Sequence, residues 1–197
     1  MQSIQTVSEN TIYVGASDRR LAKFENLFPI PRGVSYNAYV ILDEKTALLD
    51  TADASVGAQF LENVAAALDG RKLDYLIVDH MEPDHAAMIE AVLVRWPDLR
   101  LVVNAKTLPM LKMYFPTDSA AIDDALVVKE GDTLDLGKHK LTFVMAPMVH
   151  WPEVMMTFDT TTGTLFSADA FGTFGALEGA LFADEVDFAG KWLDDAR

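Results

Sequence analysis

Residues 80–85 place four titratable side chains within six positions, in the order His-Met-Glu-Pro-Asp-His. The segment follows the apolar run 75–78, which is typical of a buried strand. Pro83 disfavours helical backbone before it and is favoured in the first turn of a helix, so we expect a bent loop and then a helix starting near Asp84. In α/β sheets, ligands collect at the carboxyl ends of strands, and this segment lies at such an end. The four side chains are His80, Glu82, Asp84 and His85.

Two further strand ends carry a candidate metal ligand. His150 follows the predicted strand 141–145, and Asp169 follows the predicted strand 164–167. Imidazole and carboxylate groups without sulfur suit iron, manganese or zinc, and the high share of carboxylate favours a redox-active iron pair. Six candidate ligands exceed what one tetrahedral ion needs. The residue types therefore favour a site for two metal ions.

Each of these residues also has an ordinary structural interpretation. Asp84 can cap a helix, Glu82 can face solvent, and a single histidine or aspartate at a strand end is usually structural. For the set as a whole, gathering several carboxylates and imidazoles away from water is costly unless a cation or mutual pairing compensates. The combination therefore favours metal binding more strongly than any member does alone.

Composition narrows the class of protein. The chain has 197 residues and no cysteine, which excludes disulfides, thiolate metal sites and cysteine nucleophiles. Its formal charge of −14 repels nucleic acid and anionic membrane surfaces, so neither is an expected partner. No apolar run is long enough to span a bilayer, and no signal peptide is evident at the N-terminus. We expect a cytoplasmic protein.

The predicted elements change in style along the chain. Strands are predicted at 11–15, 36–42, 46–50, 74–78 and 99–103, and helices at 60–68, 88–96 and 108–114, which together indicate an α/β sheet with parallel neighbours. After Ala125, short strands separated by turn residues predict a run of hairpins, at 126–128, 132–136, 140–145, 154–158 and 164–167. With no repeat or linker in the sequence, one domain at residues 1–197 is expected.

With these motifs in place, the sequence resembles the metallo-β-lactamase superfamily and, within it, the flavodiiron proteins. The hydrolases of that superfamily carry His-x-His-x-Asp-His, whereas this chain has Glu82 at the second histidine position, as the flavodiiron variant does. The resemblance extends from Gly33-Val34-Ser35-Tyr36-Asn37-Ala38-Tyr39 through His150-Trp151-Pro152-Glu153 to the segment 165–172. It implies an α/β fold, the metallo-β-lactamase-like four-layer αβ/βα sandwich.

The resemblance also implies a ligand set and a reaction. One iron would be bound by His80, Glu82 and His150, the other by Asp84, and Asp169 would bridge the two. His85 would bind the second iron or lie beside it. From its position next to His150, Trp151 is expected to pack the pocket wall rather than to carry electrons. The centre would reduce dioxygen to water or nitric oxide to nitrous oxide, with electrons from FMN and from rubredoxin or a similar donor. A head-to-tail homodimer is implied as well.

The sequence departs from the family pattern toward its C-terminus. Neither the further histidine expected for the second iron nor a flavodoxin-like domain for FMN is found, so we expect a C-terminally incomplete domain that is inactive alone. His139 is expected to lie exposed in a hairpin turn, and residues 184–197 are expected to form a helix. Two alternatives stay open, namely a stand-alone diiron oxygen sensor and a zinc hydrolase. Glu82 disfavours the hydrolase, because a carboxylate ligand lowers the Lewis acidity of the metal.

Overall fold

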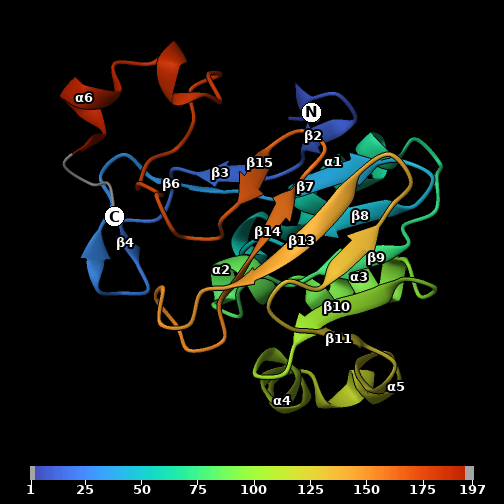
Figure 1. Cartoon of the computed structure of the whole chain (residues 1–197). Coiled ribbons are helices and arrows are strands. Elements are labelled where there is room, and N and C mark those ends of the chain that lie inside the picture. Colours follow the sequence, from blue (N-terminus) through green and yellow to red (C-terminus); the bar gives the residue numbers. More distant parts are fainter. Residues whose placement is uncertain (1–2, 194–197) are drawn as a thin grey trace.

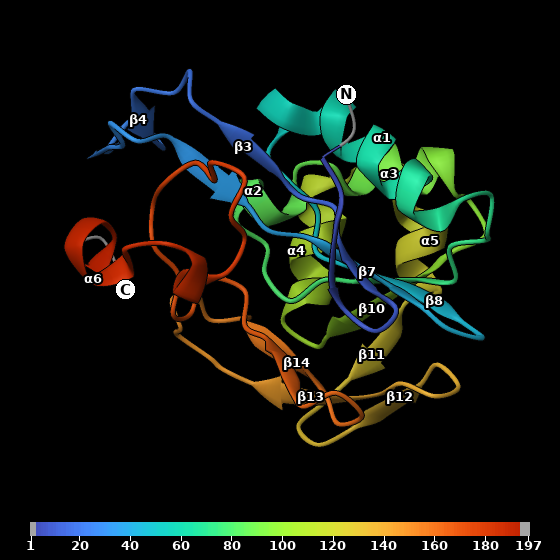
Figure 2. The ribbon, with the colours of Figure 1, turned by 90° about the horizontal axis from the view of Figure 1, so that it is seen from above.

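The computed structural model describes residues 3–193, whose two main sheets face each other, with helices over the outer face of the larger one (Figures 1 and 2). The larger sheet has seven strands in the order β1-β2-β7-β8-β9-β10-β11, and the smaller has four in the order β12-β13-β14-β15. The strands of the larger sheet are β1 (Gln5–Ser8), β2 (Thr11–Tyr13), β7 (Tyr39–Leu42), β8 (Thr46–Leu49), β9 (Tyr75–Ile77), β10 (Arg100–Asn104) and β11 (Leu126–Val128). Those of the smaller are β12 (Thr133–Asp135), β13 (Lys140–Met145), β14 (Met155–Asp159) and β15 (Thr164–Phe166).

Strand direction divides the larger sheet into two halves. β1, β2, β7 and β8 are antiparallel neighbours, whereas β8, β9, β10 and β11 run parallel. Helical crossovers connect the parallel strands, as parallel pairing requires. These helices are α1 (Gly57–Leu68), α2 (Pro83–Ala86), α3 (Ile89–Arg95), α4 (Thr107–Tyr114) and α5 (Ser119–Asp123). The carboxyl ends of β8, β9 and β10 consequently lie at one edge of the sheet.

Two apolar layers hold the structure together. One lies between the helices and the larger sheet and contains Phe60, Val64 and Leu76. The other lies between the two sheets and contains Ile77 and Phe143. Adjacent residues of β9 thus enter different layers, because side chains alternate across a strand. With both faces covered, β8 is buried at every position, as is typical of parallel strands in α/β folds.

Several expected elements are present with slightly different ends. The hairpin through residues 43–45 joins β7 to β8, and α1 ends at Asp69, which adopts the left-handed conformation before Gly70. The run of hairpins after residue 130 forms the smaller sheet. These parts of the sequence prediction are confirmed.

The expected single strand at residues 36–42 is wrong. The chain forms β6 (Val34–Tyr36), which pairs with β3 (Ala16–Asp18), and then enters the larger sheet as β7. The neighbouring segment bends between β2 and β3 at Gly15, where a side chain would collide with the Tyr36 carbonyl oxygen. The segments 11–18 and 34–42 therefore run side by side and change direction together. β2 and β7 belong to the larger sheet, whereas β3 and β6 form a separate two-stranded sheet.

Two other expectations need correction. Residues 126–128, expected to belong to the run of hairpins, form the parallel edge strand β11 beside β10. The reason is that α4 and α5 form a crossover between β10 and β11. The expected helix at 184–197 is interrupted at Val186, where the backbone is extended, and α6 (Phe188–Lys191) begins after Asp187 caps it by accepting from the Gly190 amide. Residues 194–197 lie outside the described residues.

The sequence did not indicate the short hairpin of β4 (Lys23–Phe24) and β5 (Phe28–Pro29), which projects at one side of the molecule (Figure 2). Across residues 3–193, no helix covers the outer face of the smaller sheet in Figures 1 and 2. Within the same residues, no helix is long and apolar enough to cross a bilayer.

Candidate metal centre

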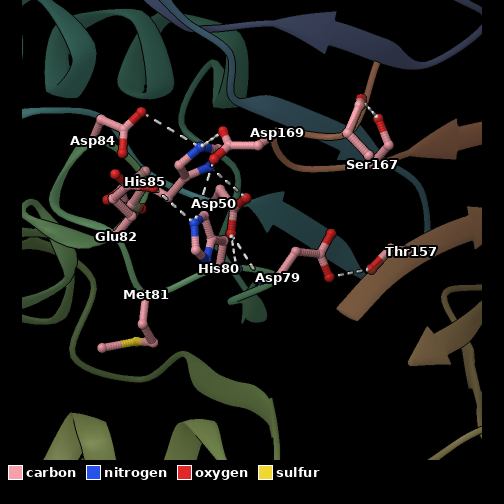
Figure 3. Close-up of polar contacts among 12 residues, drawn as sticks. Asp50, Asp79, His80, Met81, Glu82, Asp84, His85, Thr157, Ser167 and Asp169 are labelled. Carbon is pink, nitrogen blue, oxygen red and sulfur yellow. Dashed lines mark hydrogen bonds and ion pairs between the residues drawn. The ribbon is translucent and has the colours of Figure 1, made fainter. Parts of the chain in front are cut away.

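The candidate centre lies where four strands end. β9 leads into residues 79–82, β8 leads into Asp50, the β13–β14 loop carries His150, and β15 leads to Asp169. Pro83 occupies the first turn of α2, and Glu82 precedes it with extended backbone, so the bent loop predicted from the sequence is present. Met81 points away from its neighbours into the helix-side core, while His80 and Glu82 turn toward the centre (Figure 3).

One group of ligand atoms belongs to His80, Glu82, His150 and Asp169, with one atom from each within 4.8 Å of the others. Nε2 of His80 lies 3.1 Å from Oε2 of Glu82, and Nε2 of His150 lies 2.7 Å from the same oxygen. Oδ2 of Asp169 lies 3.0 Å from Nε2 of His150 and 3.4 Å from Nε2 of His80. Both imidazoles thus direct Nε2 to one point.

A second group consists of Asp84, His85 and Asp169, again with one atom from each within 4.8 Å of the others. Nε2 of His85 lies 2.7 Å from Oδ1 of Asp169 and 3.6 Å from Oδ2 of Asp84. The other oxygen of Asp84, Oδ1, is buried and has no hydrogen-bond partner. Asp169 therefore offers one carboxylate oxygen to each group, as a ligand that bridges two cations would.

The turn that presents Asp169 is tightly built. Ser167 Oγ donates to the Ala170 carbonyl oxygen at 2.9 Å (Figure 3). The Gly172 amide donates to the Asp169 carbonyl oxygen at 3.0 Å. A side chain at Gly172 would place its Cβ 2.9 Å from that same oxygen. Glycine at this position lets the turn close and hold Asp169 over both groups.

A layer of buried carboxylates supports the histidines from behind. Oε1 of Glu153 lies 2.8 Å from Nδ1 of His80, and Oδ2 of Asp50 lies 3.0 Å from Nδ1 of His85. Oδ1 of Asp50 also accepts from the Asp79 amide at 2.7 Å. A ligand histidine commonly donates its second ring N–H to a carboxylate in this way, which fixes the tautomer and the ring orientation.

The centre is buried on one side and open on the other. The side chain of His80 is 0% exposed, whereas that of His150 is 53% exposed and that of Asp169 is 34% exposed. Trp151 stands edge-on to the His80 ring, with ring centroids 5.4 Å apart and an interplanar angle of 90°. The indole thus lies beside a candidate ligand, as a wall residue would.

The imidazole and carboxylate side chains of the centre shift one another's pKa values strongly, as tightly paired ions do. Burial alone would lower the pKa of His80, but hydrogen bonds with Asp169, Glu153 and Glu82 outweigh it and raise the pKa to about 11. For His85, burial is likewise outweighed by Asp169 and Asp50, and its pKa lies well above the usual value. Burial would raise the pKa of Asp169, but hydrogen bonds from both histidines hold it far below the usual range. Burial raises the pKa of Asp84 to about 6. Protons here occupy positions that a cation would compete for.

The donor set fits divalent cations. It contains imidazole nitrogen and carboxylate oxygen, gathered in two groups that share one carboxylate, and a buried carboxylate oxygen of Asp84 lacks a partner. Such sets suit iron, manganese or zinc, and two groups sharing Asp169 suit a pair of ions. All six candidate ligands predicted from the sequence are among the residues brought together, although their individual roles stay predictions.

Sequence reasoning missed the supporting residues. Asp50 and Asp79 also follow predicted strands, so the strand-end argument applied to His150 would have pointed to them. Glu25, in the β4–β5 turn, was missed as well. Partial burial and then the charge of Glu82, with which it shares a hydrogen bond, raise the pKa of Glu25. No sequence signal placed that hairpin beside the centre.

The expectation that His139 is exposed is wrong. The residue is 1% exposed, and its Nδ1 lies 2.8 Å from Oδ2 of Asp159, while its amide donates to Asp43. The hairpin that carries it packs against the β7–β8 turn, so the imidazole is covered and paired. His139 is not among the two groups of potential metal ligands in the described residues.

The fold and the two-group centre define a metal-binding domain of the metallo-β-lactamase type, and comparison with known families agrees. The family model described as "ODP family beta lactamase" matches residues 34–192. The chain therefore belongs to this family, whose members include the beta-lactamase-like domains of flavodiiron proteins.

The chain is similar to proteins named as nitric oxide reductases. It is 38% identical over 183 residues to the anaerobic nitric oxide reductase flavorubredoxin of Klebsiella pneumoniae, covering 92% of this chain and 37% of that protein. It is 36% identical over 192 residues to a nitric oxide reductase of Moorella thermoacetica, covering 96% of this chain and 47% of that protein. The chain thus spans less than half the length of these relatives.

Solved structures agree on the fold. The flavodiiron protein from Giardia intestinalis superposes with a TM-score of 0.89 at 28% identity, over 96% of this chain and 45% of that one. Rubredoxin oxygen:oxidoreductase from Desulfovibrio gigas superposes with a TM-score of 0.89 at 30% identity, over 95% of this chain and 46% of that one. The predicted metallo-β-lactamase-like class is confirmed.

Proposed function

We propose that this chain is the diiron-binding part of a flavodiiron oxidoreductase that reduces dioxygen to water, nitric oxide to nitrous oxide, or both. The observation that carries the proposal is Asp169, whose two carboxylate oxygens face two separate groups of candidate ligands. His80, Glu82 and His150 would hold one iron, and Asp84 and His85 the other, with Asp169 shared. We further propose that residues 1–197 act as one domain.

Two irons, if bound by these two groups, would supply electrons jointly to a diatomic substrate. The residues of the chain would orient the ligands and leave a path for the substrate. Nε2 of each histidine faces the centre, the side that carries His80 is buried, and the exposed side at His150 leaves access for a small molecule. Trp151 would form part of the wall of that opening.

Electrons would reach the centre from an FMN carried by another domain or polypeptide, with rubredoxin or a similar protein as the earlier donor. The names of two relatives, a flavorubredoxin and a rubredoxin oxygen:oxidoreductase, support this choice of donors. A homodimer that brings a flavin to each centre remains part of the proposal, as does a cytoplasmic location.

The test loads the chain anaerobically with ferrous iron and measures metal content by mass spectrometry. The loaded chain is then mixed with an excess of reduced FMN-containing flavodoxin, and dioxygen or nitric oxide is followed with an electrode. About two irons per chain and continuous consumption are expected. The matched control is Asp159→Asn, which removes a buried carboxylate paired with a histidine outside the centre.

Two other outcomes of this test would indicate a different function for the chain. A single, stoichiometric uptake of dioxygen without turnover would indicate a sensor module in place of a reductase. Preference for zinc, together with hydrolysis of a thioester or lactam, would indicate a hydrolase. Either result would overturn the proposed reduction.

A further inference from the structure

Glu153 is a buried carboxylate that lies outside both groups of candidate ligands. It comes three residues after His150 in the β13–β14 loop, and its side chain is 0% exposed. One oxygen, Oε1, makes both of its described side-chain contacts, while Oε2 is buried with no hydrogen-bond partner. Burying a carboxylate in this manner is costly, so the contacts of Oε1 must compensate for it.

The first contact of Oε1 determines how His80 can act. A carboxylate can only accept, so His80 must carry a proton on Nδ1, which lies 2.8 Å from Oε1. When the imidazole is neutral, the lone pair is then on Nε2, which faces Glu82 and Asp169 at 3.1 and 3.4 Å. Glu153 therefore selects the tautomer of His80 that can bind a cation within the first group.

The second contact joins two loops. The Met81 amide donates to the same Oε1 at 3.0 Å, so Glu153 ties the β13–β14 loop to the main chain between His80 and Glu82. Just after it, the Met155 amide donates to the Asp79 carbonyl oxygen at 3.0 Å. The loop that carries His150 is thus attached to the loop that carries His80 and Glu82.

A third connection comes from the end of β10, which supplies no candidate ligand. Asn104 Nδ2 donates to the Glu153 carbonyl oxygen at 2.5 Å, and Lys106 Nζ donates to the Pro152 carbonyl oxygen at 3.0 Å. Asn104 is itself buried, and its Oδ1 accepts from the amides of Lys106 and Thr107. The main chain at Glu153 is therefore fixed independently of its carboxylate.

We propose that Glu153 is a positioning residue of the metal centre, which sets His80 to bind through Nε2 and holds the His150 loop in register with the His80 loop. This inference rests on the proposed two-metal site. It explains why a buried carboxylate is present where an apolar side chain would otherwise pack at lower cost. Asn104 acts with Glu153 by holding its main chain.

The test uses the whole chain, titrated anaerobically with Co²⁺ and followed by visible absorption and by NMR of the exchangeable imidazole N–H protons, which Co²⁺ shifts strongly. Glu153→Gln keeps an oxygen that can accept from His80 and Met81, whereas Glu153→Leu removes both acceptors. The control is Glu130→Gln, an exposed glutamate that also accepts a main-chain amide, that of Met145, but contacts no candidate ligand.

We expect Glu153→Leu to weaken Co²⁺ binding at the His80 group by about 10- to 100-fold, the usual loss when such a supporting carboxylate is removed. It should also remove one exchangeable N–H resonance. Glu153→Gln should retain that resonance and lose less affinity, and Glu130→Gln should resemble the unmodified chain. If Glu153→Leu fails to fold, Asn104→Asp removes the donor to the Glu153 carbonyl while keeping the Oδ1 acceptor, and should weaken the same group.

Unchanged affinity and an unchanged N–H resonance in Glu153→Leu would overturn the inference. So would equal losses in Glu153→Gln and Glu153→Leu, because charge rather than orientation would then matter. Failure of the proposed function looks different, since the unmodified chain would itself bind fewer than two Co²⁺ ions.

Discussion

The metal-free protein should lose stability as pH rises above neutrality, in the opposite sense to its metal affinity. In the folded state the pKa of His80 is about 11 and that of His85 lies well above its usual value, because carboxylate partners outweigh burial. An unfolded histidine has a pKa of about 6.5. Each histidine therefore contributes its full stabilisation below about pH 6.5, and this contribution is lost as pH rises toward the folded pKa.

The magnitude follows from the number of protons. Between about pH 7.5 and 9 His80 is charged in the folded chain and neutral in the unfolded chain, so it takes up about one proton on folding. The raised pKa of His85 adds to this uptake in the same direction. Each proton changes the free energy of unfolding by about 1.4 kcal/mol per pH unit, so His80 alone sets the lower limit of the expected loss and His85 increases it. The pKa of Asp79 is shifted in the same direction, because burial and then the charge of Asp50 raise it well above the usual value. Asp169 does not, since its lowered pKa leaves it ionised in both states throughout this range.

The assay is urea unfolding of chelator-treated chain at intervals of half a pH unit, compared with His80→Gln, whose slope should be smaller by about one proton. Calorimetry of Co²⁺ binding in buffers with different ionisation enthalpies should then show about two protons released per chain. A flat or rising stability between pH 7.5 and 9 in the metal-free chain would refute the ion-pair description of the centre.

Three substitutions test other parts of the structure. Asp169→Asn keeps the size of the side chain but leaves a single ligand oxygen, so metal content should fall from two ions to one or none; two retained ions would exclude a bridging role. Phe143→Ala removes a fully buried ring between the two sheets and should lower the free energy of unfolding by about 3–5 kcal/mol in denaturant titrations, and a cost below about 1 kcal/mol would show that the inter-sheet layer is loosely packed. His139→Ala leaves the carboxylate of Asp159 buried without its imidazole partner and should cost about 3–5 kcal/mol, while Co²⁺ affinity, the check on its independence from the centre, stays unchanged.

The sequence predicted the parts that depend on local pattern and on strand ends. Apolar runs and turn residues located β9, β10 and the hairpins of the smaller sheet, and the ligand types at 80–85, 150 and 169 indicated a metal site. The rest depends on contacts between distant segments. The sequence around Gly15 does not indicate that the main chain of Tyr36 packs against it. β11 joins the larger sheet because the helices between β10 and β11 form a crossover.

The supporting carboxylates were harder to predict for the same reason. Asp50 and Glu153 each lie far along the chain from the histidine that they contact, at separations of 35 and 73 residues. The sequence around a single acidic residue in a strand or loop does not indicate which distant histidine it will contact. His139 illustrates the converse, because a lone histidine in a turn looks exposed until the β7–β8 turn is placed beside it.

The two halves of the centre are also separated in time during synthesis. Asp169 lies 84 residues after His85, which pairs with it. At translation rates of 5–20 residues per second, the ribosome completes the first half of the site roughly 4–17 s before the residue that joins both groups. Until His150 is synthesised the segment 80–85 has neither His150 nor Asp169 beside it, and until the end of the interval it lacks Asp169. A metal would therefore be selected by the geometry of the folded pocket and by the ions available when the second sheet docks. The nascent segment 80–85 would not select it alone.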